Sequence, residues 1–191
     1  AAALICWLLA LGTKEIAITL PALIFLVEWF FFRSLSANYL VRNLKFWLIP
    51  AAIAAAIALV YLKMNPIEHF KAAYEMRDFT MSERMLTQFR VVIFYLTLII
   101  LPSPERLTLD HHIITSTSLI APITTLLSVL AVIGVLALAV YLAKRHRLLA
   151  FCILWYFINL AVESSIIAIE MAYEHRLYLP MLMVILLIIV L

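Results

Sequence analysis

The sequence predicts an all-α fold, a polytopic bundle of transmembrane helices with about six membrane segments. Of its 191 residues, 67% are hydrophobic and 13% are charged, whereas a soluble domain carries roughly 25% charged residues. The apolar runs are long and lack the period-two alternation of barrel strands. Because backbone groups in lipid must be satisfied within the protein, such runs are expected to be helices.

The first three expected spans lie in the first third of the chain. Residues 1–11 are expected to be the end of a truncated helix, and residues 16–32 the next span, which closes with an aromatic belt typical of the membrane interface. Residues 46–62 are rich in alanine, a small residue that lets membrane helices pack closely. The positive-inside rule then predicts that the basic loop between the second and third spans is cytoplasmic.

The middle of the chain is expected to lie outside. Residues 63–87 mix acidic, basic and large apolar side chains, which indicates a structured outer loop with an amphipathic helix at the interface. Residues 89–101 form a short apolar segment, whereas a span needs roughly 20 residues. This segment is therefore consistent with a re-entrant element or with a tilted crossing.

The last three expected spans are 122–143, 148–162 and 179–191, the last of them truncated. The basic run that begins at Lys144 separates the first two and is again expected to be cytoplasmic. This topology brings three polar segments to the outer side. They are Gly12–Glu15, Asp110–His112 and Glu163–Tyr178.

The segment from Glu163 to Pro180 carries three glutamates. If it is helical, Glu163, Glu170 and Glu174 lie on one stripe, because their spacings of seven and four residues match the helical period. Ionisable groups at membrane depth mark ion, substrate or catalytic sites. The alternative is a hydrated loop at the membrane surface.

These residue types point to specific chemistry. A carboxylate at the membrane surface can act as a general base, and lysine or arginine can hold a phosphate. Lys14 is a candidate phosphate ligand or an interfacial anchor. His111 and His112 lack metal-ligand spacing, so we expect no cofactor, although a divalent metal is left open.

Other classes of function find little support in the sequence. With two glycines in the chain there is no phosphate-binding loop, dinucleotide fingerprint or nucleophile elbow. A net charge of +3 spread over several loops indicates no nucleic-acid partner. Membrane lipid is the expected surrounding.

Three stretches, GTKEIAITLP, TQFRVVIFYLTLIILPSPERLTLDHHI and ESSIIAIEMAYEHRLYLP, resemble bacterial polytopic proteins that carry C-terminal tetratricopeptide repeats. Those proteins are similar to the transmembrane and tetratricopeptide-repeat O-mannosyltransferases of animals, in the GT-C superfamily of glycosyltransferases. The resemblance implies an enzyme of the bacterial inner membrane. It would move a sugar from a polyprenyl-phosphate lipid donor to a protein or glycan acceptor on the extracytoplasmic side.

The resemblance also implies which residues line the site. Glu174 and Asp110 would be catalytic, and Lys14 would lie near the donor phosphate. The family's usual acidic base would precede Ala1, and the repeats would follow Leu191, so we expect the chain to be an internal fragment. The expected substrate-binding residues are Lys14, Glu15, His175, Arg176 and Tyr178.

Two alternatives to an enzyme stay open at this stage. A non-catalytic scaffold or assembly subunit would use its outer loops to bind a partner protein, with its acidic side chains hydrated. A transporter would use the glutamate stripe as a proton relay, and it requires a glutamate facing water in the middle of the membrane.

Overall fold

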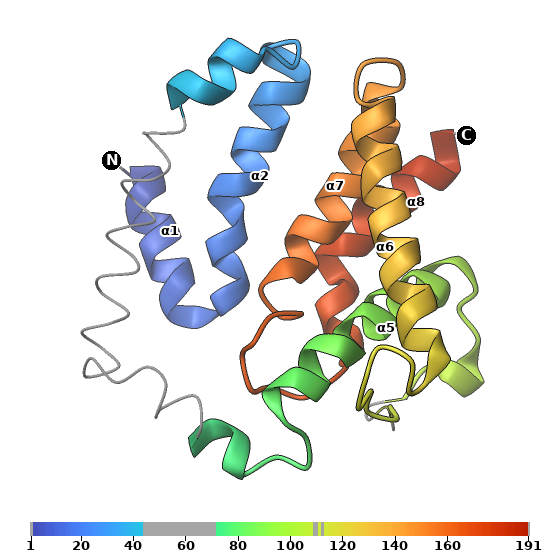
Figure 1. The fold of residues 1–191 in the computed structure, drawn as a ribbon. Helices are drawn as coiled ribbons and strands as arrows, with labels where there is room; N and C mark the ends of the chain where they lie inside the picture. Colours follow the sequence, from blue (N-terminus) through green and yellow to red (C-terminus); the bar gives the residue numbers. More distant parts are fainter. Residues whose placement is uncertain (1, 44–71, 109–110, 112, 191) are drawn as a thin grey trace.

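The computed structural model describes residues 2–43, 72–108, 111 and 113–190. Over these ranges the chain is helical and has no strand, as the sequence predicts. The expected third span, 46–62, lies outside the described residues, and so does the start of the expected outer loop. Figure 1 shows helices α2, α6, α7 and α8 running between two ends of the molecule, with α5 crossing near one of these ends.

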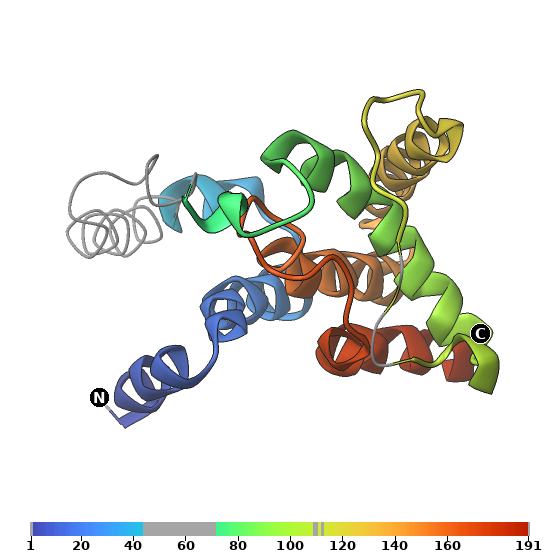
Figure 2. The ribbon, with the colours of Figure 1, turned by 90° about the horizontal axis from the view of Figure 1, so that it is seen from below.

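The N-terminal part is a broken helical hairpin. Helix α1 (Ala2–Thr13) turns at Lys14 into a 3₁₀ helix, η1 (Glu15–Thr19). The chain continues as α2 (Leu20–Val27) and then as a π-helical turn, η2 (Glu28–Phe32). Both views show α1 at the edge of the molecule, and the indole of Trp7 ties it to η1 by donating to the Ala17 carbonyl at 2.7 Å (Figures 1 and 2).

Helix α5 (Met81–Ile100) starts at a well-formed N-terminus. Thr80 and Glu83 form a capping box, in which each side chain binds the other residue's backbone N–H. The buried face of α5 changes character along its length. Arg84, Thr87 and Gln88 are buried in the first half and are followed by apolar residues, among them Tyr95.

The C-terminal half is an antiparallel set of three helices, α6 (Ile123–Leu142), α7 (Arg147–Ala161) and α8 (Tyr178–Val190). Short 3₁₀ turns, η3 (Pro104–Arg106) and η4 (Glu174–Leu177), lie in the connections. Apolar side chains of α5 to α8 form one core cluster, and a second one joins α2 to α7.

The expectation of about six membrane segments is wrong. In the part of the chain that the structure describes, α6 is the one helix long and apolar enough to cross a membrane. A helix rises 1.5 Å per residue, so the 15 residues of α7 cover about 22 Å of a hydrocarbon core of about 30 Å. The run 16–32 is divided among η1, α2 and η2.

The short apolar segment 89–101 is not a separate element either. It is the C-terminal part of the 20-residue helix α5, which begins at Met81 inside the expected outer loop. Three charged residues, Glu83, Arg84 and Arg90, set α5 apart from α6. Hydrophobicity alone missed this helix because its first half is polar and faces protein.

Candidate functional site

The segment between α7 and α8 is a folded loop rather than a helix. Residues 162–173 form turns and extended stretches, and η4 is the only helical turn before α8. The expected glutamate stripe is therefore absent. Each glutamate has a different partner: Glu163 pairs with Arg176, Glu170 with Arg77, and Glu174 with His111.

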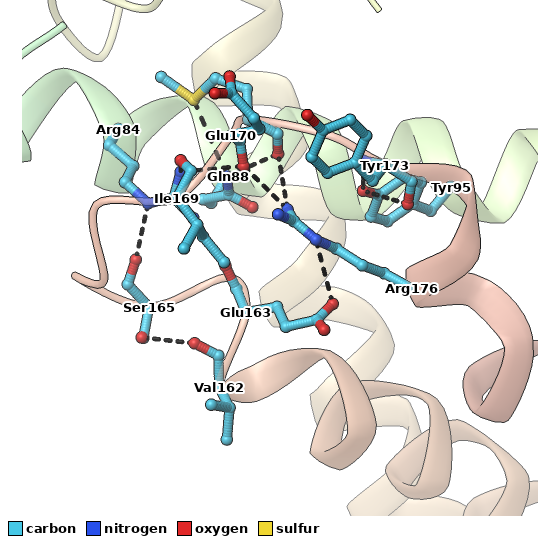
Figure 3. Close-up of polar contacts among 11 residues, drawn as sticks. Arg84, Gln88, Tyr95, Val162, Glu163, Ser165, Ile169, Glu170, Tyr173 and Arg176 are labelled. Atoms are coloured by element: carbon cyan, nitrogen blue, oxygen red, sulfur yellow. Dashed lines mark hydrogen bonds and ion pairs between the residues drawn. The ribbon is translucent and has the colours of Figure 1, made fainter. Parts of the chain in front are cut away.

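A buried ion pair closes this loop. The Nε atom of Arg176 lies 3.3 Å from Oε2 of Glu163, and the two side chains are 5% and 3% exposed. Arg176 also donates from Nη1 to the Glu170 carbonyl at 2.9 Å (Figure 3). A buried charge is tolerated when it is paired and hydrogen-bonded, so this geometry explains how both side chains remain inside.

Arg84 of α5 holds the same loop from the opposite side. Its side chain is fully buried and donates to four backbone carbonyls, which belong to Glu163, Ser165, Ile169 and Glu170 (Figure 3). Burial lowers the pKa of the guanidinium from 12.5 to about 10, so it is charged at neutral pH. The guanidinium of Arg84 thus supplies the hydrogen-bond donors that these loop carbonyls would have in a helix.

Two further side chains of α5 complete the attachment. Gln88 donates from Nε2 to the Met171 carbonyl at 3.0 Å. The Tyr95 hydroxyl accepts from the backbone N–H of Tyr173 at 2.7 Å and lies 3.1 Å from the Tyr173 carbonyl (Figure 3). Sequence reasoning missed Arg84, Gln88 and Tyr95, although their spacing of four and seven residues places them on one helical face, a detectable signal.

His175 of η4 lies in the field of two positive charges. The pKa of His175 is lowered by partial burial, by the positive charge of Lys14 and by that of Arg176. Lys14 precedes η1 and His175 lies in η4, 161 positions further along the chain. The His175 ring also stacks on Tyr173, with centroids 5.2 Å apart.

The carboxylate of Glu174 contacts the segment that follows α5. Its Oε1 atom accepts from the backbone N–H of Thr108 at 2.7 Å and lies 3.1 Å from Nε2 of His111. The carboxylate side chain is 31% exposed and that of His111 is 8% exposed. The segment after α5 is thus joined to η4, and a carboxylate remains accessible there.

The expected site residues fall into three groups. Glu174, His175 and Arg176 are consecutive residues of η4, with Arg176 buried, and the turn between α1 and η1, which contains Lys14, lies at the same end of the molecule (Figure 1). Tyr178, at the start of α8, is 72% exposed. The backbone of Glu15 lies in η1 beside Lys14, and Asp110 lies outside the described residues.

Within the described ranges, no three His, Cys, Asp or Glu side chains are grouped so as to hold a metal ion. His111 is paired with a single carboxylate. The side chains that the structure places here offer hydrogen bonds and charge to a ligand.

No family model, curated protein or solved structure matches the chain. The likeness to GT-C glycosyltransferases therefore depends on the three sequence stretches quoted above.

Proposed function

We propose that the chain is part of a membrane-bound glycosyltransferase that transfers a sugar from a polyprenyl-phosphate donor to a protein or glycan acceptor. The observation that carries this proposal is the partly exposed carboxylate of Glu174 in η4, beside His175, whose pKa is lowered by partial burial and by the positive charges of Lys14 and Arg176. A phosphate-linked donor requires a cation for its phosphate and a base for the acceptor hydroxyl. The motifs quoted above independently favour the same chemistry.

The arrangement of α6 supports a location in a membrane. Its buried positions include the small polar residues Thr125 and Ser128, whereas Leu127, Leu130 and Ile133 are more than half exposed. Small residues at helix contacts and large apolar ones outside are typical of membrane helices. An exposed apolar face of this kind is well solvated by lipid.

The sidedness follows from the basic residues. The turn between α6 and α7 carries Lys144 and Arg145, and Arg147 begins α7. This basic end of the molecule is opposite the loop between α7 and α8 (Figure 1). The positive-inside rule assigns the basic end to the cytoplasm. We therefore propose that Glu174 and Lys14 face the extracytoplasmic side of a bacterial inner membrane.

In the proposed reaction, Lys14 holds the donor phosphate and Glu174 takes the proton of the acceptor hydroxyl. The acceptor oxygen forms a bond with the anomeric carbon of the sugar. The bond between that carbon and the phosphate oxygen breaks, and polyprenyl phosphate leaves with the electron pair. Asp110, Glu15 and Tyr178 are proposed to complete the site, and Arg176 positions η4 through Glu163.

The experiment is a transfer assay with the full-length protein in membranes, with polyprenyl-phosphate mannose and polyprenyl-phosphate glucose as donors. Loss of a general base typically costs about 100-fold or more in rate. Glu174→Gln is therefore expected to reduce turnover by about this factor, and Lys14→Gln to raise the KM for the donor. Glu75→Gln, the same change at an exposed glutamate outside both proposed sites, serves as the control.

Full turnover in both site variants, with the fold intact, would refute the assigned roles. Absence of transfer from either donor by the wild-type protein would refute the proposed reaction.

One observation favours a scaffold instead: Arg84, Glu163 and Arg176 all make internal contacts, which make the loop rigid. A scaffold would keep its partner bound in Glu174→Gln and would show no sugar transfer at all.

A further inference from the structure

A groove of about 700 Å³ runs along α2 on the side that faces α7. Most of its lining is apolar and comes from successive turns of one helix. The apolar residues that line it are Leu20, Leu23, Ile24, Val27, Phe32 and Trp155. This groove is separate from the cluster around Glu174.

A charged pair closes one end of the groove. Arg33 reaches Oε1 of Glu28 with both Nε and Nη2 at 3.0 Å, and its guanidinium lies over the Tyr39 ring at 5.1 Å. These two side chains are 49% and 38% exposed. A guanidinium has five N–H donors, and the Glu28 contacts use two of them. The remaining donors match a phosphate group.

The backbone at this end is strained. Glu28–Phe32 is a π-helical turn, and Ser34 and Leu35 follow with φ angles of 47° and 58°. π-helical turns are rare, and positive φ angles are uncommon for residues other than glycine; both recur at functional sites. They fix the direction in which Arg33 leaves the helix.

The length and orientation of the groove fit one leaflet of a bilayer. From Leu20 to Arg33 a helix rises about 20 Å, compared with about 15 Å of hydrocarbon in one leaflet. Leu35 packs in the same cluster as Ala143 and Leu148, so Arg33 shares its end of the molecule with the basic turn between α6 and α7.

We propose that this groove binds a membrane glycerophospholipid, with the phosphate at Arg33 and one acyl chain along α2 against Trp155. An apolar channel that ends at the ion pair of Arg33 and Glu28, with N–H donors of the partly exposed guanidinium left over, is complementary to such a molecule in shape and in hydrogen bonding. The site is at the end of the molecule opposite Lys14 and Glu174, and it does not depend on the proposed glycosyl transfer.

The test uses the full chain in phosphatidylcholine vesicles that contain a phosphatidylglycerol with a photoreactive diazirine in its acyl chain. After irradiation, the labelled residues are identified by mass spectrometry. We expect labelling of α2 and Trp155. A diacylglycerol carrying the same diazirine, which lacks the phosphate, is expected to label these positions about tenfold less.

Matched variants separate this site from general contact with lipid. Ile24→Trp fills the groove, whereas Ile133→Trp makes the same change at an equally exposed position of α6, the two isoleucines being 56% and 57% exposed. Arg33→Gln removes the phosphate ligand, and Arg145→Gln removes an exposed arginine at the same end. Ile24→Trp and Arg33→Gln are expected to reduce labelling of α2 about tenfold, and their controls to leave it unchanged.

Equal labelling in Ile24→Trp and Ile133→Trp would overturn the groove as the binding site. Equal losses in Arg33→Gln and Arg145→Gln would assign the effect to general attraction by a basic surface and would overturn the phosphate site. Circular dichroism checks that each variant keeps its helix content. Leu20→Trp, at another lining position, replaces Ile24→Trp if the latter does not fold.

Discussion

The carboxylate of Glu163 and the guanidinium of Arg176 pair at 3.3 Å inside the protein, at the two ends of the loop that joins α7 to α8. The pair fixes the span of the loop, and the four carbonyl contacts of Arg84 fix its path. Glu174 and His175 come directly before Arg176 in the chain. The buried charges therefore place the exposed residues of the candidate site.

Breaking the buried pair is expected to destabilise the fold strongly. Glu163→Gln leaves an uncompensated charge on Arg176, and removal of one partner from a buried pair typically costs about 3–5 kcal/mol. Glu28→Gln makes the same change in the exposed pair with Arg33 and is expected to have little effect. Thermal unfolding of the purified protein measures both, and equal shifts in Tm would contradict the structural role of the buried pair.

Arg84 is expected to be irreplaceable by lysine. Arg84→Lys keeps the charge, but an ammonium group has three donors and no planar fork, so several of the four carbonyls lose their partner. At about 1–3 kcal/mol for each unsatisfied buried group, a loss of about 3 kcal/mol or more is expected. Arg90→Lys, on the same helix at a partly exposed position, is the control for denaturant unfolding.

The positive charge of Lys14 is expected to affect the titration of His175. The pKa of His175 lies below its ordinary value of 6.5, partly because of Lys14, so Lys14→Gln is expected to raise it. Because the unfolded state binds the proton more readily, this histidine favours folding as the pH rises through the interval between the two pKa values, and the gain is lost on acidification. NMR titration of His175 measures the shift, and Lys144→Gln, at the other end, should leave it unchanged.

The capping box predicts where α5 frays. Thr80→Ala removes the acceptor for the Glu83 N–H and is expected to cost about 1 kcal/mol. Amide hydrogen exchange should accelerate in the first turn of α5 and stay slow beyond Val91, where the helix is buried. Thr124→Ala, at an exposed threonine of α6, provides the comparison, and uniform acceleration along α5 would contradict a local effect.

The sequence predicted helices correctly where apolar residues dominate, as in α6 and α7. It failed where long-range contacts decide the structure. An amphipathic helix was expected within 63–87, but not its continuation into the apolar run 89–101 as the single helix α5. The polar start of α5 is buried because Arg84 binds carbonyls of a loop some 80 residues away. The glutamate spacing suggested a helix, but each of the three carboxylates pairs with a different cation. The partners are Arg176 for Glu163, Arg77 for Glu170 and His111 for Glu174.

For the candidate site, too, the sequence predicted the residue types but not their burial. The residue types named from the sequence, Lys14 and Glu174 to Arg176, lie at one end of the molecule, but periodicity gave no sign that Arg176 would be buried and Tyr178 exposed. That difference depends on the direction in which the chain leaves η4 to enter α8. The number of spans was overestimated because apolar runs such as 16–32 and 148–162 were expected to be spans, whereas the first is divided among η1, α2 and η2 and the second forms the 15-residue helix α7.

The π-helical turn Glu28–Phe32 has a consequence for the architecture at Arg33. Such a turn accommodates one residue more than an α-helix of the same rise, and each residue of an α-helix advances by about 100° around the axis. Deleting one residue there would restore regular winding and rotate everything beyond it by roughly this angle relative to α2. The extra residue of the π-helical turn therefore sets the direction of Arg33 and the residues after it relative to α2.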